Sequence, residues 1–457
     1  MKKIHFIGIG GIGMSALAGI HLAKGGIVTG SDLRPNSLTD ELSRKGAVIH
    51  KGHDAENIPE DADLVVRSTC IRDDNPEIKK AIHLGVPVIL RGEMLKEIIE
   101  EVPLSIAVTG THGKTTTSAL VAHITEHCGK DPTVVVGGEM SGFGGNAKFG
   151  QGNMIVSEVD ESDGYFRSIS AQYAVVTNIE REHMENYGSL EKLIDAYREF
   201  IGRIRADGFL VFNGEDSVLG RIAVDSASGK VSFGIDGDFD VTCRRHVHTN
   251  AITFDLVVRG KNHGRVSSPL VGRYNLMNIL AAIAVCMQVG LDFDRIAESV
   301  SSFRGVKRRF DSVGRIGNIE VIEDYAHHPT ELRSVIAAAR GRSSGRIVTI
   351  FQPHRYSRTR DLMREFSDCF YDSDLLILTD IYSADEDVIE EVAVRDMYEM
   401  MDKEKFEALD LVKKKDIPEF VSGLVRQNDT ILVLGAGDIS EISGNLVKRI
   451  EEKTDAC

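Results

Sequence analysis

Short apolar runs alternate with helix-length amphipathic segments along the first 90 residues. The apolar runs are rich in β-branched residues and predict strands at residues 4–7, 27–29, 47–49, 64–66 and 88–90. Segments with helical spacing lie between them, for example at residues 15–24 and 76–84. Strands that alternate with helices in this way are typical of a parallel, doubly wound sheet.

A second α/β pattern opens with a buried-strand run at 104–108, followed by a glycine turn and a helix over 114–128. Residues 238–272 alternate polar and apolar positions with few helix formers, which predicts antiparallel ribbons. The remaining elements predicted here are strands at 133–136, 155–156, 174–176 and 209–212 and helices at 276–289 and 293–303.

From about residue 304, after a basic stretch, the alternation restarts. Strands are predicted at 319–322, 346–351, 375–378 and 430–434, with helices between them. No internal repeat is evident. We therefore expect an α/β protein of three domains, over residues 1–98, 99–303 and 304–457.

Composition restricts the classes of function. Hydrophobic residues make up 42% and charged residues 27%, which is typical of globular proteins. The net charge of −15 opposes a general affinity for nucleic acid or anionic membranes. The longest strongly apolar stretch, 279–287, is far short of the roughly 20 residues of a membrane span, and the N-terminus does not resemble a signal peptide. These features predict a cytoplasmic protein with no membrane insertion.

The cysteines are scattered, without the paired spacing of a zinc site or the clustering of a disulfide framework. We expect most of them to be small, buried apolar residues. They are Cys70, Cys128, Cys243, Cys286, Cys369 and Cys457.

The first glycine turn, residues 8–13, has the form G-x-G-x-x-G between a predicted strand and a helix. Asp32 follows about 20 residues later, as in dinucleotide-binding turns. Such glycines let the backbone approach a pyrophosphate at the helix N-terminus. Three interpretations stay open from these residues: NAD or FAD binding, binding of another diphosphate, and a tight turn without a ligand.

The second glycine turn, residues 109–117, reads T-G-T-H-G-K-T-T-T and again joins a strand to a helix. It departs from the strict P-loop spacing, but it has the P-loop chemistry: backbone N–H groups for phosphate, Lys114 for the β- and γ-oxygens and a hydroxyl for Mg²⁺. The alternatives are ATP or GTP binding and a structural turn. A protein with both turns is expected to consume one nucleotide and to recognise another as a handle on its substrate.

Charged and histidine-containing segments follow three further strands. Residues 157–163, SEVDESD, contain four carboxylates, which are either a solvated loop or Mg²⁺ ligands at a strand end. His183 follows the next strand and has a structural or a functional interpretation. Residues 352–360, QPHRYSRTR, are either an anion-binding cluster or a charged surface, and residues 324–329, DYAHHP, follow another strand.

In combination, these segments resemble the ATP-dependent Mur ligases of peptidoglycan synthesis, and among them most closely the ligases that join L-alanine to UDP-N-acetylmuramate. The resemblance covers essentially the whole chain. The segments that carry it, in order, are HFIGIGGIGMSALA, GTHGKTTT, EVDESD, NIEREHME, GRYNLMNILAA, VKRRFD, EDYAHHPTE, FQPHRYSRTR and GAGDI. The resemblance implies a Rossmann-like UDP-binding domain, a P-loop ATPase domain and a C-terminal Rossmann-like domain that helps to bind the amino acid.

The resemblance also implies roles for individual residues. The UDP-sugar set is Gly10, Gly11, Ile12, Gly13, Met14, Ser15 and Asp32. The ATP set is Gly110, Thr111, His112, Gly113, Lys114, Thr115, Thr116, Asn275, Arg308 and Asp324. The set for two Mg²⁺ sites is Thr115, Glu158 and His183. The set for the substrate carboxylate and the amino acid is Tyr325, His327, His354, Arg355 and Arg358. The catalytic residues implied are Lys114, His183, His327, Arg355 and Arg358.

The implied reaction transfers the γ-phosphoryl group of ATP to the lactyl carboxylate of UDP-N-acetylmuramate, and the neutral amine of L-alanine then displaces phosphate. Domain closure would exclude water from the acyl phosphate. The implied partners are the two substrates and ATP, and the chain is expected to be a monomer or a weak homodimer.

The sequence differs from the usual family pattern at two positions, and other classes of protein remain as alternatives. The histidine segment commonly reads Asp-His-Met but here has Glu182, and several sister ligases have a carbamylated lysine where this chain has Arg198. A recycling ligase that attaches a tripeptide to the same UDP-sugar usually reads E-P-R-S-N-T where this chain has QPHRYSRT from residue 352. A folate-polyglutamate ligase, a nucleotide-sensing binding protein and a dehydrogenase are less consistent with the full set of segments.

Overall fold

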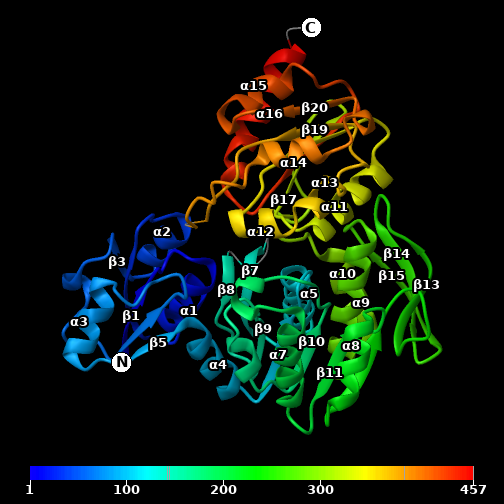
Figure 1. Cartoon of the computed structure of the whole chain (residues 1–457). Helices are drawn as coiled ribbons and strands as arrows, with labels where there is room; N and C mark the ends of the chain where they lie inside the picture. Colours follow the sequence, from blue (N-terminus) through cyan, green and yellow to red (C-terminus); the bar gives the residue numbers. More distant parts are fainter. Residues whose placement is uncertain (141–142, 144, 385, 456–457) are drawn as a thin grey trace. The chain divides into compact units, whose positions relative to one another are not determined.

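The computed structural model describes residues 1–140, 143, 145–384 and 386–455. Its strands form three sheets, one in each of the predicted α/β segments (Figure 1). The chain divides into two compact units, and the first unit contains both the first sheet and most of the second. The first unit is Met1–Arg245, Phe254–Ser267 and Met277–Phe303, and the second is His246–Thr253, Ser268–Leu276 and Arg304–Cys457. The predicted three-segment α/β fold is confirmed, while the domain boundaries after residues 98 and 303 stay predictions.

The first sheet has five parallel strands in the order β3-β2-β1-β4-β5. Alternate side chains of β1 pack on opposite faces: Ile4 and Phe6 join the core beneath α1 and α4, and Ile7 joins the core beneath α3. This is the expected doubly wound arrangement. The elements are β1 (Lys3–Ile7), α1 (Ile12–Ala23), β2 (Ile27–Asp32), α2 (Ser37–Arg44), β3 (Val48–Lys51), β4 (Leu64–Arg67), α3 (Pro76–Leu84), β5 (Val88–Leu90) and α4 (Arg91–Glu101).

The second sheet has ten strands in the order β15-β14-β13-β12-β11-β10-β6-β9-β7-β8. Its strands are β6 (Leu104–Thr109), β7 (Thr133–Met140), β8 (Gly145–Lys148), β9 (Met154–Glu158), β10 (Tyr173–Val176), β11 (Phe209–Asn213), β12 (Gly229–Phe233), β13 (Val241–Val247), β14 (Ile252–Val258) and β15 (Lys261–Ser268). Its helices are α5 (Lys114–His127), α6 (Met184–Tyr187), α7 (Leu190–Gly202), α8 (Ser217–Ile222), α9 (Arg273–Gln288) and α10 (Phe293–Ser302). Three strands therefore occupy the stretch 238–272, where ribbons were predicted.

The third sheet lies wholly in the second unit, in the order β16-β17-β21-β18-β19-β20. Only its edge strand β16 is antiparallel to its neighbour, and helices cover both faces. The strands are β16 (Asp311–Ile316), β17 (Ile319–Asp324), β18 (Ile347–Phe351), β19 (Leu375–Leu378), β20 (Ala408–Leu411) and β21 (Thr430–Leu434). The helices are α11 (Pro329–Arg342), α12 (Tyr356–Asp361), α13 (Met363–Ser367), α14 (Val394–Met400), α15 (Ile417–Ser422) and α16 (Ser443–Asp455).

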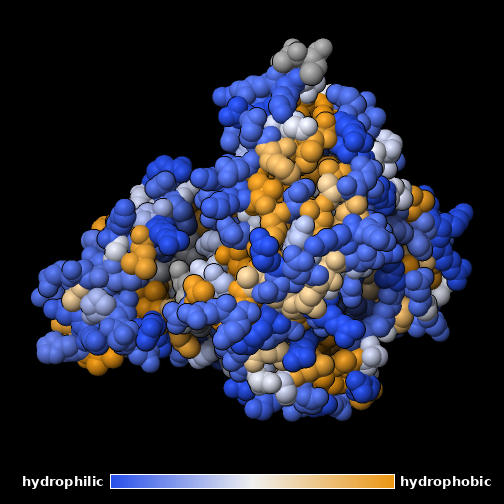
Figure 2. All heavy atoms as spheres, turned by 45° about the horizontal axis from the view of Figure 1, so that its top comes forward, coloured by the Kyte–Doolittle hydropathy of each residue, from blue (hydrophilic) through white to orange (hydrophobic). Residues whose placement is uncertain are grey.

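The predictions made from composition about the surface and the cysteines can be compared with the structure, and they agree in part. Hydrophilic residues predominate on the face drawn in Figure 2, with hydrophobic residues visible between them. Among the described residues, no helix has the length and apolar character needed to cross a membrane. Cys243, Cys286 and Cys369 are buried as expected, but Cys70 is exposed and Cys128 is half-buried. Cys457 lies outside the described residues.

Candidate active site

The second glycine turn leads from the end of β6 directly into α5, as predicted. Gly110 and Gly113 have φ angles of +130° and +82°, which L side chains rarely adopt. A Cβ atom at Gly110 would lie 2.1 Å from Thr177 Oγ1, and one at Gly113 would lie 2.4 Å from Asn278 Oδ1. Both positions therefore require glycine for backbone conformation and for space.

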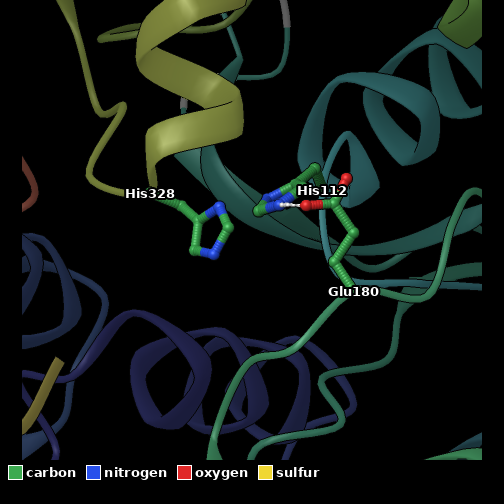
Figure 3. Close-up of side chains that lie close together, drawn as sticks. All are labelled: His112, Glu180 and His328. Carbon is green, nitrogen blue, oxygen red and sulfur yellow. Dashed lines mark ion pairs between the residues drawn. The ribbon is translucent and has the colours of Figure 1, made fainter. Parts of the chain in front are cut away.

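Residues that directly follow β10 form hydrogen bonds with this turn. Asn178 Oδ1 accepts a hydrogen bond from His112 N at 2.8 Å, and Thr177 Oγ1 donates to His112 O at 2.6 Å. Glu180 N donates to Thr111 Oγ1 at 2.8 Å, and its carboxylate lies 3.5 Å from His112 Nε2 (Figure 3). Asn178 and Glu180 were not singled out from the sequence, although both directly follow the predicted strand at 174–176.

Lys114, the first residue of α5, points back over its own turn. Its Nζ donates to Gly110 O at 2.6 Å and to Thr111 O at 3.0 Å, and it lies 2.8 Å from a carboxylate oxygen of Glu161. Burial alone would lower the pKa of Lys114, but the negative charges of Glu161, Asp160 and Glu158 raise it above the ordinary value. The ammonium group is therefore charged and fixed at the phosphate-binding turn.

Glu158, at the end of β9, is fixed beside the first turn of α5. Its carboxylate accepts hydrogen bonds from Thr115 Oγ1 at 3.1 Å and from Gly137 N at 2.7 Å. A Cβ atom at Gly137 would lie 2.6 Å from Glu158 Oε1, so glycine is needed for this close approach. The structure thus brings together Thr115 and Glu158, two of the three predicted metal ligands.

His183 lies in a different part of the same site, beside Asp160 and Glu161. Ligand atoms of these three residues all lie within 4.8 Å of one another, and His183 Nε2 is 3.8 Å from Glu161 Oε1. His183 has φ +56°, a strained value for a residue with a side chain. Carboxylate oxygens beside an imidazole are a donor set that suits a divalent cation. Asp160 and Glu161 were predicted only as members of an acidic run, and the geometry gives them a more specific place.

The two acids of this cluster, Asp160 and Glu161, have pKa values shifted in opposite directions. Burial raises the pKa of both, but Lys114, Arg91 and His183 lower that of Asp160 to about 2. For Glu161 the cost of burial and the repulsion by Asp160 outweigh the attraction of Lys114, so its pKa is raised. Burial lowers the pKa of His183, but the surrounding carboxylates raise it to a value above the ordinary one. The three groups therefore differ in their affinity for protons although they lie side by side.

Arg198 lies on the solvent-facing side of α7. It forms ion pairs with Asp195 and, at 3.3 Å, with Asp225, whereas its neighbour Tyr197 is fully buried. Its guanidinium is thus part of the exposed face of an amphipathic helix. This position gives Arg198 no contact with the Asp160–Glu161–His183 cluster.

The first glycine turn has a similarly specific geometry. Gly8 adopts φ +81°, and the N–H groups of Gly8 and Ile9 donate to Ser31 O at 2.8 and 3.1 Å. Asp32 Oδ2 accepts from Gly10 N at 2.8 Å, so this carboxylate supports the turn from within. Of the predicted UDP-sugar set, Gly10, Gly11, Ile12 and Gly13 form the turn and the start of α1, whereas the side chains of Met14 and Ser15 are buried.

In the second unit, Arg308 and Tyr325 pack together at one end of the third sheet. The Arg308 guanidinium donates to Gly435 O at 2.9 Å and to Gly437 O at 3.1 Å, and it lies 4.9 Å from the centre of the Tyr325 ring. Asp324 is buried, and its two oxygens accept from Phe310 N and Ala326 N, both at 2.7 Å. Burial raises the pKa of Asp324 to about 6, against the opposing effects of Arg309 and these N–H groups. Asp324 thus supports the local backbone of this unit.

The predicted amino-acid residues also gather at this edge of the third sheet. The rings of His327 and His354 lie 5.8 Å apart, and Arg358 Nη1 donates to His354 O at 3.1 Å. Tyr382, which was not predicted, stacks on His354 at 5.5 Å, and its carbonyl accepts from Arg355 N at 2.8 Å. Arg355 has φ +72° and ψ +139°, a strained conformation that this bracing by Tyr382 maintains.

Near the start of α9, two asparagines have different surroundings. Asn275, predicted to contact ATP, belongs to the second unit, is buried and donates to Val271 O at 2.9 Å. Asn278 belongs to the first unit and accepts a hydrogen bond from Thr117 Oγ1 of α5 at 3.3 Å. Within the first unit, Asn278 contacts α5 through this hydrogen bond. His328 belongs to the second unit, where it caps the start of α11.

Comparisons with known proteins match all three segments. Family models match residues 3–102 (Mur ligase family, catalytic domain), 108–286 (Mur ligase middle domain) and 308–437 (Mur ligase, glutamate ligase domain). The UDP-N-acetylmuramate–L-alanine ligase of Desulforamulus reducens is 42% identical over 99% of this chain and 98% of its own length. The enzyme of the same name from Geobacter sulfurreducens is 42% identical over 100% of this chain and 99% of its own length.

Solved structures are similar over nearly the whole chain. The crystal structure of UDP-N-acetylmuramate–alanine ligase from Thermotoga maritima has a TM-score of 0.85 and 33% identity, covering 99% of this chain and 100% of that chain. A murein peptide ligase from Psychrobacter arcticus has a TM-score of 0.73 at 20% identity, covering 99% of each chain. The second likeness, at this low identity, concerns the fold alone.

Proposed function

Because the chain belongs to the Mur ligase family, we propose that it joins L-alanine to the lactyl carboxylate of UDP-N-acetylmuramate at the expense of ATP, in peptidoglycan precursor synthesis. The observation that carries the proposal is the full-length identity of about 42% to ligases of that name, together with a charged lysine fixed over a phosphate-binding turn. A cytoplasmic location and a monomer or weak homodimer are parts of the same proposal.

We assign the second glycine turn to ATP. The backbone of Gly110 to Gly113 would bind the phosphates, and Lys114, now held by two carbonyls and Glu161, would exchange these partners for phosphate oxygens. Thr116, in the first turn of α5, keeps its proposed role toward ATP, and Asn278 contacts this helix through Thr117. Lys114 then neutralises charge that develops as the γ-phosphoryl group leaves ATP.

We assign two Mg²⁺ sites to the side chains around Lys114. The oxygens of Thr115 and Glu158 fit one ion, and the Asp160–Glu161–His183 cluster fits the other. Bound there, Mg²⁺ would neutralise phosphate charge and polarise the substrate carboxylate. The oxygen-rich donor set, with a single imidazole, supports this assignment. Arg198 is paired with Asp195 and Asp225 on an exposed helix face, and it belongs to neither donor set.

The chemistry follows from the poor reactivity of a carboxylate toward an amine. Transfer of the γ-phosphoryl group to a lactyl carboxylate oxygen gives an acyl phosphate and ADP. The neutral amine of L-alanine then attacks the acyl carbon, and phosphate leaves with the carboxylate oxygen. Cationic side chains stabilise the tetrahedral intermediate, and no covalent enzyme intermediate is required.

The remaining residues divide between recognition of the two substrates. The first glycine turn, supported by Asp32, would bind the UDP pyrophosphate with its N–H groups. In the second unit, His327, His354, Arg355 and Arg358 would bind carboxylates of the sugar and of alanine, with Tyr325 beside them. The strained backbone of Arg355 supports a functional role there. We also propose that Arg308 and Asn275 contact ATP. Asp324 would support this region by accepting hydrogen bonds from the local backbone.

The experiment that tests the proposal measures phosphate release by the purified protein with ATP, Mg²⁺, UDP-N-acetylmuramate and single amino acids. We expect release only when both the UDP-sugar and L-alanine are present. Rapid ATP hydrolysis with neither substrate, or micromolar binding of NAD(H), would overturn the proposal. Preference for a tripeptide over L-alanine would instead identify the recycling ligase, which the His354–Arg358 segment disfavours.

A further inference from the structure

Glu77 is a fully buried carboxylate in the first domain, outside every site described above. It is the second residue of α3, on the face of the first sheet opposite α1. Burial of a charge is costly unless the charge is compensated by hydrogen bonds and ion pairs. The groups that compensate Glu77 connect it to the first glycine turn.

Three groups donate hydrogen bonds to the Glu77 carboxylate. Ser31 Oγ donates to Oε2 at 2.6 Å, Asn57 Nδ2 donates to Oε1 at 2.7 Å, and Asp54 N donates to Oε1 at 3.3 Å. Ser31 lies near the end of β2, whereas Asp54 and Asn57 belong to the segment that follows β3. The carboxylate therefore joins the carboxyl ends of two adjacent parallel strands.

Two histidines complete the surroundings of the carboxylate. His5 Nε2 lies 3.6 Å and His53 Nδ1 lies 3.5 Å from Glu77 Oε2. Burial would raise the pKa of Glu77, but interactions with His5, Ser31 and Asn57 lower it below the ordinary value. Glu77 is consequently ionised and acts only as an acceptor.

Ser31 transmits the position of Glu77 to the glycine turn. Its side chain is held by Glu77, while its carbonyl oxygen accepts from Gly8 N at 2.8 Å and from Ile9 N at 3.1 Å. The next residue, Asp32, accepts from Gly10 N at 2.8 Å. The backbone N–H groups of Gly8, Ile9 and Gly10 are thus hydrogen-bonded to the end of β2, and the Ser31 side chain there is hydrogen-bonded to Glu77.

Ser31 also determines which nitrogen of His53 carries the proton. His53 Nδ1 lies 2.9 Å from Ser31 Oγ, and the single hydroxyl proton of Ser31 is already donated to the ionised Glu77. His53 must therefore donate from Nδ1, which in the neutral ring leaves Nε2 as the acceptor nitrogen. His53 follows β3 at the carboxyl edge of the sheet, where open α/β sheets bind ligands, and 12% of its side chain is exposed.

We propose that Glu77 is a positioning residue for the UDP-sugar: through Ser31 it fixes the first glycine turn and holds His53 as the Nδ1–H tautomer. The inference rests on the proposed function, because it takes this turn as the UDP-sugar site. Glu77 itself does not touch the substrate, and its effect is on substrate affinity and not on the chemical step.

Glu77→Gln is the informative variant, because it keeps the shape of the side chain. The N–H groups of Asn57 and Asp54 can only donate, whereas the Ser31 hydroxyl can reverse its direction. The glutamine therefore turns its carbonyl toward Asn57 and Asp54 and its NH₂ toward Ser31. The Ser31 hydroxyl then donates to His53 Nδ1, and the proton of His53 moves to Nε2.

The experiment measures the Kd of the full chain for UDP-N-acetylmuramate by calorimetry and the His53 tautomer by ¹⁵N imidazole NMR, with His53→Asn to assign the signal. We expect the Kd to rise about tenfold or more in Glu77→Gln, with kcat at saturation and the KM for ATP within about twofold of wild type. The ¹⁵N shifts should change from an Nδ1–H to an Nε2–H ring. Ser31→Ala should give no additional loss when combined with Glu77→Gln.

The matched control is Thr29→Val, which removes the 2.8 Å partner of His5 Nδ1 in the same buried cluster without touching Ser31. This variant should lower stability but leave the Kd within about twofold of wild type. The proposal is overturned if Glu77→Gln leaves the Kd or the tautomer unchanged, or if Thr29→Val weakens binding equally. A wild-type chain that does not bind the UDP-sugar would contradict the proposed function instead.

Discussion

Lys114 Nζ and the Glu161 carboxylate form a buried ion pair of 2.8 Å in the phosphate-binding turn. Because the backbone carbonyls of Gly110 and Thr111 also accept hydrogen bonds from Lys114, the ammonium group is held by acceptors on more than one side. Phosphate oxygens can replace such acceptors without leaving the lysine uncompensated. The turn is thus organised for an anion before one binds.

Lys114→Ala should reduce kcat by roughly 100-fold or more, because the lysine meets charge that develops during phosphoryl transfer. Thermal stability should also fall, because the variant leaves the buried Glu161 carboxylate without this ion-pair partner, so kcat is compared at a temperature where the variant is folded. Steady-state phosphate release measures the effect. Lys148→Ala, which removes another ion-paired lysine, is the control and should retain wild-type turnover. Near-wild-type turnover of Lys114→Ala would refute the P-loop assignment.

His183→Ala should raise the Mg²⁺ concentration for half-maximal rate by about tenfold or more, because it removes one donor of the Asp160–Glu161–His183 cluster. The measurement is a Mg²⁺ titration at saturating substrates. His21→Ala, on α1, should leave the titration unchanged. An unaltered Mg²⁺ dependence of His183→Ala would show that this cluster does not hold the ion.

Much of the fold was predictable, because buried parallel strands leave unmistakable apolar runs. The helix predicted at 114–128 is α5 (Lys114–His127), and the strand at 375–378 is β19 (Leu375–Leu378). By contrast β8, which reads G-N-A-K, has little intrinsic β propensity. It becomes a strand only because β7 offers a partner, and pairing of this kind is invisible in a local pattern.

The site was predictable where a residue belongs to a recognisable motif. Lys114 and Glu158 were predicted as site residues in this way, and their roles stay predictions. Asn278 and Tyr382 were not predicted, because what places them near the site is contact with residues far away in sequence, Thr117 and His354. The burial of Met14 and Ser15 could not be predicted from the motif either, because the motif does not show which side of α1 faces the core.

Asp324 should make stability depend on pH between about 4 and 6. Its pKa is about 6 in the folded protein, against an ordinary value of 3.8. The folded state therefore binds the proton more tightly, and the stabilisation is present below about pH 4 and lost as the pH rises through 6. Relative to Asp324→Asn, wild type should lose on the order of 2 to 3 kcal/mol of unfolding free energy over this range. Urea unfolding at several pH values measures this difference, and a constant difference would contradict the expectation.

Activity should not depend on dissolved CO₂. Arg198 keeps its positive charge at any usable pH and is paired with Asp195 and Asp225 on an exposed helix face, so it supplies no carbamate. Rates in CO₂-depleted and bicarbonate-supplemented buffers at fixed pH and ionic strength should agree. A reproducible severalfold stimulation by bicarbonate would point to a carbamylated lysine, with Lys192 the nearest candidate in sequence.

We propose that this chain activates the lactyl carboxylate of UDP-N-acetylmuramate as an acyl phosphate for attack by L-alanine. The most direct test uses substrate with ¹⁸O at both oxygens of that carboxylate, followed by mass analysis of the phosphate and of the amide product formed with ATP, Mg²⁺ and L-alanine. If the acyl phosphate forms, we expect one ¹⁸O atom in each phosphate and one in the product amide. Phosphate without ¹⁸O would contradict it, because ATP would then have been cleaved by water and not by the carboxylate.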